Sequence, residues 1–197
     1  MIETAIKSFL RLLFIVLVFH LLSIPALPVL SQESFRDSSE IFKESHHLLP
    51  DFDDSYGVVF DDISGDMRPD IYVVRFRNLN RLFIQSADSL AFEDHTIRAG
   101  LGGNLMPRGL QNLELGASSV DINNDGLRDI IIAGWGETTH LFLQQKDGRF
   151  QDITEVAGLI PPIDGNGAFW ADVDIDGNLD LFITDEHHVN HLYLGDG

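Results

Sequence analysis

The chain has 197 residues, and its 31 Asp and Glu residues against 13 Lys and Arg residues give it a net charge of −18. Nucleic acid and anionic membrane surfaces would repel such a chain, so we exclude both as partners. Because the chain has no Cys, disulfide scaffolds, thiolate metal sites and a cysteine nucleophile are excluded as well. The 14 Phe residues and the 44% hydrophobic content favour a folded protein over an acidic disordered chain.

The beginning of the chain has the pattern of a secretory signal peptide. Lys7 and Arg11 precede an apolar run over residues 12–24, which is short for a bilayer span. We predict that residues 1–31 are a signal peptide cleaved before Gln32, and an uncleaved amino-terminal anchor is the alternative. After cleavage we expect no stable membrane span, and we expect the mature chain to be secreted or otherwise extracytoplasmic.

The rest of the chain is one sequence unit repeated three times. Counted forward from Gly57, Gly116 and Gly167, each copy has an Asp five residues on and a further Asp eight residues later. A strongly apolar run follows the second Asp. Similarity at a fixed period is the signature of a repeat architecture. We therefore expect a repeat segment over residues 32–197, with repeats at approximately 35–91, 92–149 and 150–197 and the last one truncated.

Each copy has the pattern of four strands. The apolar run after the second Asp is short and rich in β-branched and aromatic residues, which suits a strand buried on both faces. The Asp-Gly pair within Lys146–Arg149 predicts a hairpin before a fourth strand. We predict an all-β fold of about three four-stranded antiparallel β-propeller blades. A closed ring usually takes roughly 4–8 blades, so we expect an incomplete propeller, in a chain that is a piece of a longer protein or an open array.

A nine-residue loop lies between the first and second predicted strands of each copy. The second and third loops, DINNDGLRD and DVDIDGNLD, fit the pattern D-x-[DN]-x-D-G-x-x-D. A hard cation such as Ca²⁺ takes about six to eight oxygen ligands, which side chains at positions 1, 3, 5 and 9 and a carbonyl at position 7 would supply. The candidate ligands are Asp121, Asn123, Asp125, the Leu127 carbonyl and Asp129 in the second loop, and Asp172, Asp174, Asp176, the Asn178 carbonyl and Asp180 in the third.

The first loop, DISGDMRPD, is a degenerate copy. Met67 stands where the other loops have a glycine that permits a positive φ, and the Arg68 side chain puts a positive charge beside the site. Its candidate ligands are Asp62, Ser64, Asp66, the Arg68 carbonyl and Asp70. We predict two good Ca²⁺ sites and one degenerate site, with affinity falling from the third loop to the second and then to the first. The alternative is that these Asp residues only stabilise turns.

The combination of these features resembles the FG-GAP/VCBS repeats of integrin α-type β-propellers. The strings GASSVDINNDGLRDIII and GAFWADVDIDGNLDLFI carry this resemblance, and LFLQQKDGRFQDITEVAGL is similar to the branch of cartilage acidic proteins and ASPIC/UnbV proteins. The resemblance covers about residues 35–197. It implies Ca²⁺ bound in the inter-strand loops and an extracellular binding or adhesion role, with a protein or glycan as the ligand.

The alternative function is the propeller scaffold of a secreted hydrolase or lyase. Its candidate residues are His46, His47 and the segment EHHVNH at residues 186–191, in which His187 and His191 could meet a metal. The sequence has no Gly-x-Ser-x-Gly, His-Glu-x-x-His or P-loop pattern. We therefore expect that the chain is not an enzyme.

Overall fold

The computed structural model describes residues 55–103, 113–135, 139–159 and 163–196. The chain divides into two compact units, Met1–Ser38 and Ser39–Gly197, and all described residues belong to the second unit. The predicted signal peptide and the beginning of the first repeat therefore lie outside the described residues. Among the described helices, none is long and apolar enough to cross a membrane.

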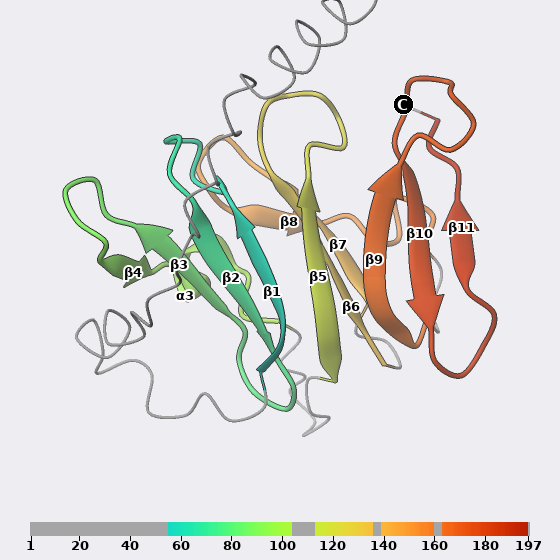
Figure 1. The fold of residues 1–197 in the computed structure, drawn as a ribbon, viewed down its shortest axis with the longest axis horizontal. Helices are drawn as coiled ribbons and strands as arrows, with labels where there is room; N and C mark the ends of the chain where they lie inside the picture. The colour runs from blue at the N-terminus through green and yellow to red at the C-terminus, as the bar shows by residue number, and fades with distance from the viewer. Residues whose placement is uncertain (1–54, 104–112, 136–138, 160–162, 197) are drawn as a thin grey trace, which may run out of the picture. The chain divides into compact units, whose positions relative to one another are not determined.

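The described residues form three antiparallel sheets, each built from consecutive strands (Figure 1). The first sheet contains β1 (Ser55–Asp61), β2 (Asp70–Arg75), β3 (Arg81–Gln85) and β4 (Phe92–Asp94). The second contains β5 (Glu114–Val120), β6 (Asp129–Gly134), β7 (His140–Gln144) and β8 (Phe150–Asp152). The third has three strands, β9 (Gly165–Ala171), β10 (Asp180–Asp185) and β11 (His191–Tyr193). This arrangement confirms the predicted all-β fold of propeller-like blades.

The short outer strands and one turn of helix complete the units. β4 pairs with β3 and β8 pairs with β7, so each of these sheets takes as its outer strand the segment with which the next predicted repeat begins. After β4 the chain forms α3 (Thr96–Ala99), one turn of helix in a unit for which the sequence predicted strands alone. The Thr96 hydroxyl accepts the Leu82 N–H at 2.9 Å, which fixes this turn against the sheet.

The core lies between neighbouring sheets, and β6 contributes to both sides of it. Every residue of β6 is buried. Because successive side chains of a strand point to opposite faces, Ile130 and Ile132 pack against the first sheet, whereas Ile131 and Ala133 pack against the third. Full burial of one such side chain contributes about 1.5–3 kcal/mol. The central blade is therefore held on both faces, as its continuous apolar run predicts.

The glycines at the origins of the first two repeats are required by the close approach of the first strands. A Cβ atom on Gly57 would lie 2.9 Å from the Gly116 Cα, and one on Gly116 would lie 2.6 Å from the Asn166 carbonyl oxygen. Neither distance is compatible with a side chain, because a backbone atom is the neighbour in both cases. The repeated glycine thus sets how closely β1, β5 and β9 can pack.

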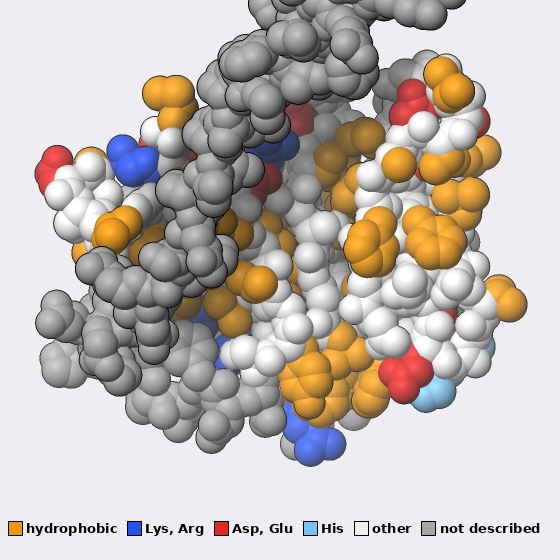
Figure 2. Space-filling model, in the orientation of Figure 1, with side chains coloured by type: hydrophobic (Ala, Val, Ile, Leu, Met, Phe, Trp, Pro, Cys, Tyr) orange, Lys and Arg blue, Asp and Glu red, His pale blue; other side chains and the backbone are white. Residues whose placement is uncertain are grey.

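The sheets do not close into a ring within the described residues. Tyr72 and Ile131, which stand at the same repeat position, are fully buried between sheets, but the corresponding Phe182 is 38% exposed. Phe169 on the neighbouring strand is 61% exposed. Figure 2 shows hydrophobic side chains gathered over β9 and β10 on this face. The third sheet therefore presents a face that in the first two sheets packs against the next sheet.

Candidate metal centres

The three loops project from the same end of their sheets because the strand pairs end in the same register. The last paired residues are Asp61 with Asp70, Val120 with Asp129, and Ala171 with Asp180. In each sheet the loop that contains the predicted ligands joins the two strands at this last pair. The structure therefore brings the predicted ligands of each loop together within that loop.

All three loops fold around the carboxylate at position 1. In each copy this carboxylate accepts the N–H groups of positions 5 and 6, at 2.8–3.1 Å. These bonds join Asp62 to Asp66 and Met67, Asp121 to Asp125 and Gly126, and Asp172 to Asp176 and Gly177. The position 5 carboxylate in turn accepts the N–H of position 7, which is Arg68, Leu127 or Asn178. The loop backbone is thus fixed by its own acidic side chains.

The carboxylate at position 9 fastens each loop to the third strand of its sheet or to the residues after it. Asp70, Asp129 and Asp180 are at most 1% exposed. One oxygen of each accepts an N–H from position 2 or 3 of its loop at 2.7–3.0 Å. The other accepts the N–H of Gln85, Gln144 or Gly195 at 2.8–2.9 Å. Each carboxylate oxygen has a second lone pair, so these residues remain able to contact a cation. The sequence predicted them as ligands and missed this structural role.

Two position 9 carboxylates differ in their pKa. Backbone N–H groups of Val173 and Gly195 lower the pKa of Asp180, because they stabilise its charged form. Burial instead raises the pKa of Asp129, although the Gln144 and Ile122 N–H groups oppose the shift. The third loop therefore holds its last carboxylate in the charged state more firmly than the second loop does.

The third loop brings three further carboxylates together. One oxygen from each of Asp172, Asp174 and Asp176 lies within 4.8 Å of the others. Two oxygens bound to one Ca²⁺ at about 2.3–2.6 Å can lie up to about 5 Å apart, so this spacing fits a single ion. Loss of solvation and then the charge of Asp176 raise the pKa of Asp174. The site carries a negative potential that a bound cation would relieve.

The second loop has an amide where the third has its middle carboxylate. Asn123 Oδ1 accepts the Asp125 N–H at 3.1 Å, and Asn123 Nδ2 donates to Asp125 Oδ2 at 3.1 Å. The third loop has an equivalent bond, in which Asn178 Nδ2 donates to Asp176 Oδ2 at 3.0 Å, so the loops differ in the number of carboxylates and not in this contact. With one carboxylate fewer, the second loop has a weaker negative potential than the third.

The first loop contains its own cation. The Arg68 guanidinium forms a salt bridge with Asp66, and the Arg68 N–H also donates to Asp66 Oδ1 at 2.9 Å. Met67 has a φ of 66°, which is the left-handed conformation expected at this position. Ser64 donates its N–H to Asp70 at 2.7 Å. The degeneracy predicted from the sequence therefore appears as an internal ion pair beside the predicted ligands.

A second left-handed position in every loop is a feature that the sequence analysis missed. Position 4 has a positive φ in all three copies, at 77° for Gly65, 58° for Asn124 and 64° for Ile175. Glycine and asparagine adopt this conformation readily, but a β-branched residue does not. Gly65 and Asn124 at position 4 of the first two loops could have indicated this conformation from the sequence, but Ile175 at position 4 of the third loop does not indicate it.

The candidate loops of the second and third sheets flank a cavity of about 280 Å³. Asp121 and Asn123 line it from the second loop, and Asn178 lines it from the third. The aromatic rings of Trp170 and Tyr193 form part of its wall. The cavity thus combines polar groups with two aromatic side chains, which is typical of a small-ligand site.

The histidines of the alternative enzymatic hypothesis fall into two groups. His46 and His47 lie outside the described residues. His187 Nδ1 lies 3.2 Å from Asp164 Oδ2, and His191 Nε2 lies 3.3 Å from Asp185 Oδ2. These two histidines thus pair with different carboxylates, at the end of β10 opposite to the nine-residue loop.

Comparison with known proteins identifies one family. Residues 121–197 match the family model of the FG-GAP-like repeat. The matched segment begins at position 1 of the second loop and includes the whole of the third. A search of the curated proteins gives no match.

Proposed function

We propose that this chain, whose residues 121–197 match the FG-GAP-like repeat, is an extracytoplasmic calcium-binding module of propeller-like blades that binds an extracellular protein or glycan. The observation that supports this proposal best is the convergence of Asp172, Asp174 and Asp176 within 4.8 Å in an exposed loop. Ca²⁺ accepts oxygen ligands alone, and every predicted ligand in the three loops is an oxygen atom. Binding, rather than catalysis, is the role that we propose.

Calcium would act mainly as a structural ion. An ion that binds the folded chain alone stabilises it by mass action. With a Kd of about 10⁻⁴ M and about 10⁻³ M Ca²⁺, each filled site contributes roughly 1.4 kcal/mol. The second and third loops together would then contribute about 3 kcal/mol, a substantial share of the stability of one domain.

The cavity between the second and third loops supports a binding role. Trp170 and Tyr193 offer apolar ring surface, and Asp121, Asn123 and Asn178 offer polar groups beside it. A ligand with one flat apolar face and several hydroxyl groups, such as a sugar ring, has the complementary chemistry. Because Asp121, Asn123 and Asn178 are also candidate calcium ligands, we expect ligand binding at this cavity to depend on Ca²⁺.

Thermal melting in Ca²⁺ and in EGTA tests the calcium proposal. We expect the midpoint of the wild-type chain to rise by roughly 6–12 °C in 1 mM Ca²⁺, because each of the about 3 kcal/mol shifts the midpoint of a chain of this size by about 2–4 °C. The substitution Asp174→Asn should remove part of this shift, because it lowers the negative charge of the third loop. A midpoint that is the same in both buffers would contradict the proposal.

Asp147→Asn is the matched control. Asp147 is an exposed acidic residue whose carboxylate accepts the Arg149 N–H at 3.1 Å in an Asp-Gly turn. Its substitution removes one negative charge from the chain but none from a candidate loop. We expect the Ca²⁺-dependent shift of this variant to equal that of the wild type.

A further inference from the structure

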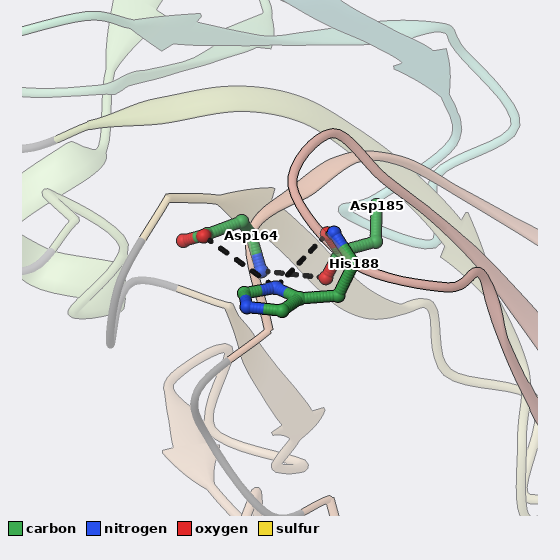
Figure 3. Close-up of side chains that lie close together, drawn as sticks. All are labelled: Asp164, Asp185 and His188. Carbon is green, nitrogen blue, oxygen red and sulfur yellow. Dashed lines mark hydrogen bonds and ion pairs between the residues drawn. The ribbon is translucent and has the colours of Figure 1, made fainter.

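A second cluster of ionisable side chains lies at the opposite end of the third sheet from its nine-residue loop. Asp180, the last residue of that loop, begins β10, whereas Asp185 ends this strand. Asp164 directly precedes β9, and His188 follows in the turn after β10. Figure 3 shows that the side chains of Asp164, Asp185 and His188 lie close together, with the His188 ring in contact with both carboxylates.

The ligand atoms of Asp164, Asp185 and His188 lie within 4.8 Å of one another, so one metal ion could contact all three. His188 Nδ1 lies 3.3 Å from Asp185 Oδ1 and 3.7 Å from Asp164 Oδ2, and His187 Nδ1 lies 3.2 Å from the same Asp164 oxygen. Ligands at about 2.0–2.2 Å from a tetrahedral Zn²⁺ lie about 3.3–3.6 Å apart. We propose that Asp164, Asp185 and His188 bind a first-row transition-metal dication such as Zn²⁺.

The chemistry of the donors selects this class of metal. Imidazole nitrogen is a good ligand for Zn²⁺, Ni²⁺ and Cu²⁺, whereas Ca²⁺ takes oxygen alone. The Asp185 carboxylate accepts the N–H groups of His187 and His188 on Oδ1 and the N–H of Asp164 on Oδ2. These N–H bonds also fix its orientation, as outer-shell bonds do in metal sites.

The cluster is confined to the third repeat. At the repeat position of Asp185 the other copies have Arg75 and Gly134, and at the position of His188 they have Asn78 and Glu137. A set of residues needed to build a blade would recur in every blade. The His188 side chain is also 53% exposed, so it contributes little to the core. The convergence of these donors is therefore a local property of this blade.

A histidine–carboxylate pair on the second sheet provides a matched control. His140 Nδ1 lies 2.8 Å from Asp152 Oδ2, so an imidazole and a carboxylate meet there as they do in the cluster. Among the described residues, His140 and Asp152 do not belong to a group of three or more possible metal ligands, as His188 does. If the Asp164, Asp185 and His188 cluster were only a set of ion pairs, substituting His188 and substituting His140 would have the same effect on metal binding.

Calorimetric titration of the full chain with ZnCl₂, in excess CaCl₂ so that the nine-residue loops do not compete, tests the proposal. We expect one saturable Zn²⁺ site per chain. Asp164→Asn and His188→Gln should each weaken Zn²⁺ binding by more than the roughly 10- to 100-fold that loss of an outer-shell partner causes. His140→Gln should bind as the wild type does. Asp185 is not substituted, because its carboxylate accepts the N–H groups of His187 and His188 and so holds the turn.

Trp135 offers a second readout at the site itself. Its ring lies 5.8 Å from the His187 ring in an edge-on contact. Binding of Cu²⁺ should quench its fluorescence in the wild type and in His140→Gln, and the quenching should be lost in His188→Gln. His188→Gln keeps the proposal testable if Asp164→Asn does not fold. Absence of saturable Zn²⁺ binding, wild-type affinity in His188→Gln, or an equal loss in His140→Gln would each overturn the proposal, and none of them would alter the Ca²⁺-dependent melting.

Discussion

The first and third nine-residue loops have the same backbone hydrogen bonds, but the negative charge of their carboxylates is neutralised to a different extent. In the first loop the Arg68 guanidinium pairs with Asp66. The third loop has no basic residue, and its carboxylates at positions 1, 3 and 5 converge within 4.8 Å. The same loop backbone can thus place its carboxylates beside a basic side chain of the chain itself or beside one another, where a free cation can neutralise them. The residues at positions 3 and 7 make the difference, because Ser64 and Arg68 of the first loop stand where the third loop has Asp174 and Asn178.

The two loops also differ in how their neighbours support them. Ile63 in the first loop is 2% exposed, and its carbonyl accepts the Gln144 Nε2–H of the second sheet at 2.8 Å. The corresponding Val173 in the third loop is 54% exposed. The first loop is therefore stabilised by packing and by a contact between sheets. Within the described residues the third loop depends more on its own hydrogen bonds, so an ion would contribute more there.

The largest effect should come from the part that the two loops share. Asp70→Ala and Asp180→Ala each leave two partly buried N–H groups without an acceptor, and a fully buried group of this kind costs about 1–3 kcal/mol. We expect both variants to lose about 2–4 kcal/mol of unfolding free energy in urea titrations performed in EGTA. A loss in only one of the two loops would contradict the common frame.

The sequence predicted the frame because its signals are local. The Asp residues at fixed spacing, the apolar runs behind them and the Asp-Gly turn at Asp147 lie within single hairpins. The role of the position 9 carboxylate was missed because its partners, such as Gln85 for Asp70, come from the end of another strand. The packing of β6 against two cores could be predicted from the sequence. Its apolar run indicates a strand buried on both faces, and successive side chains of a strand point to opposite faces.

The Asp164, Asp185 and His188 cluster could not be predicted from the repeat. Asp164 is 21 residues from Asp185, and the two meet because the Asp164 N–H donates to Asp185 Oδ2 at 3.0 Å. The sequence analysis singled out His187 and His191, but in the structure they pair with different carboxylates. Residue type therefore indicated the region, and only the packing of β9 beside β10 identified the partners.

A smaller effect should follow from removing the internal cation of the first loop. The Arg68 and Asp66 side chains are 34% and 30% exposed, so their salt bridge contributes at most about 1 kcal/mol. In EGTA we expect Arg68→Gln to lose up to this amount. In Ca²⁺ it should recover the loss, because the loop then has unpaired carboxylates like those of the third loop. Melting in the two buffers measures both effects.

Arg149→Gln is the control for this exchange. Arg149 Nε lies 3.8 Å from Asp147 Oδ2 on an exposed turn, away from the three loops. Its substitution should leave the Ca²⁺-dependent part of the melting shift unchanged. If Arg68→Gln shows no greater response to Ca²⁺ than Arg149→Gln does, the internal cation is not what separates the first loop from the third.

The smallest effect concerns backbone strain, which each loop has at a different position. Ile175 has a φ of 64° at position 4 of the third loop, and Met67 has a φ of 66° at position 6 of the first. Their side chains are 88% and 92% exposed, so substituting them removes strain without removing core contacts. Because the left-handed conformation costs an L-residue about 1–2 kcal/mol and Asn tolerates it, Ile175→Asn should stabilise the chain by about 1 kcal/mol. Met67→Gly should gain only about 0.5 kcal/mol, because glycine loses more conformational entropy on folding.

Urea unfolding in EGTA measures both gains without a contribution from Ca²⁺. Val156→Asn is the control, because Val156 is 90% exposed and is not among the residues with a positive φ. This variant exchanges an exposed apolar side chain for an amide without relieving any strain, so its stability should stay close to that of the wild type. If Ile175→Asn is no more stable than Val156→Asn, the left-handed conformation at position 4 is not a source of strain. The two loops would then differ in charge alone.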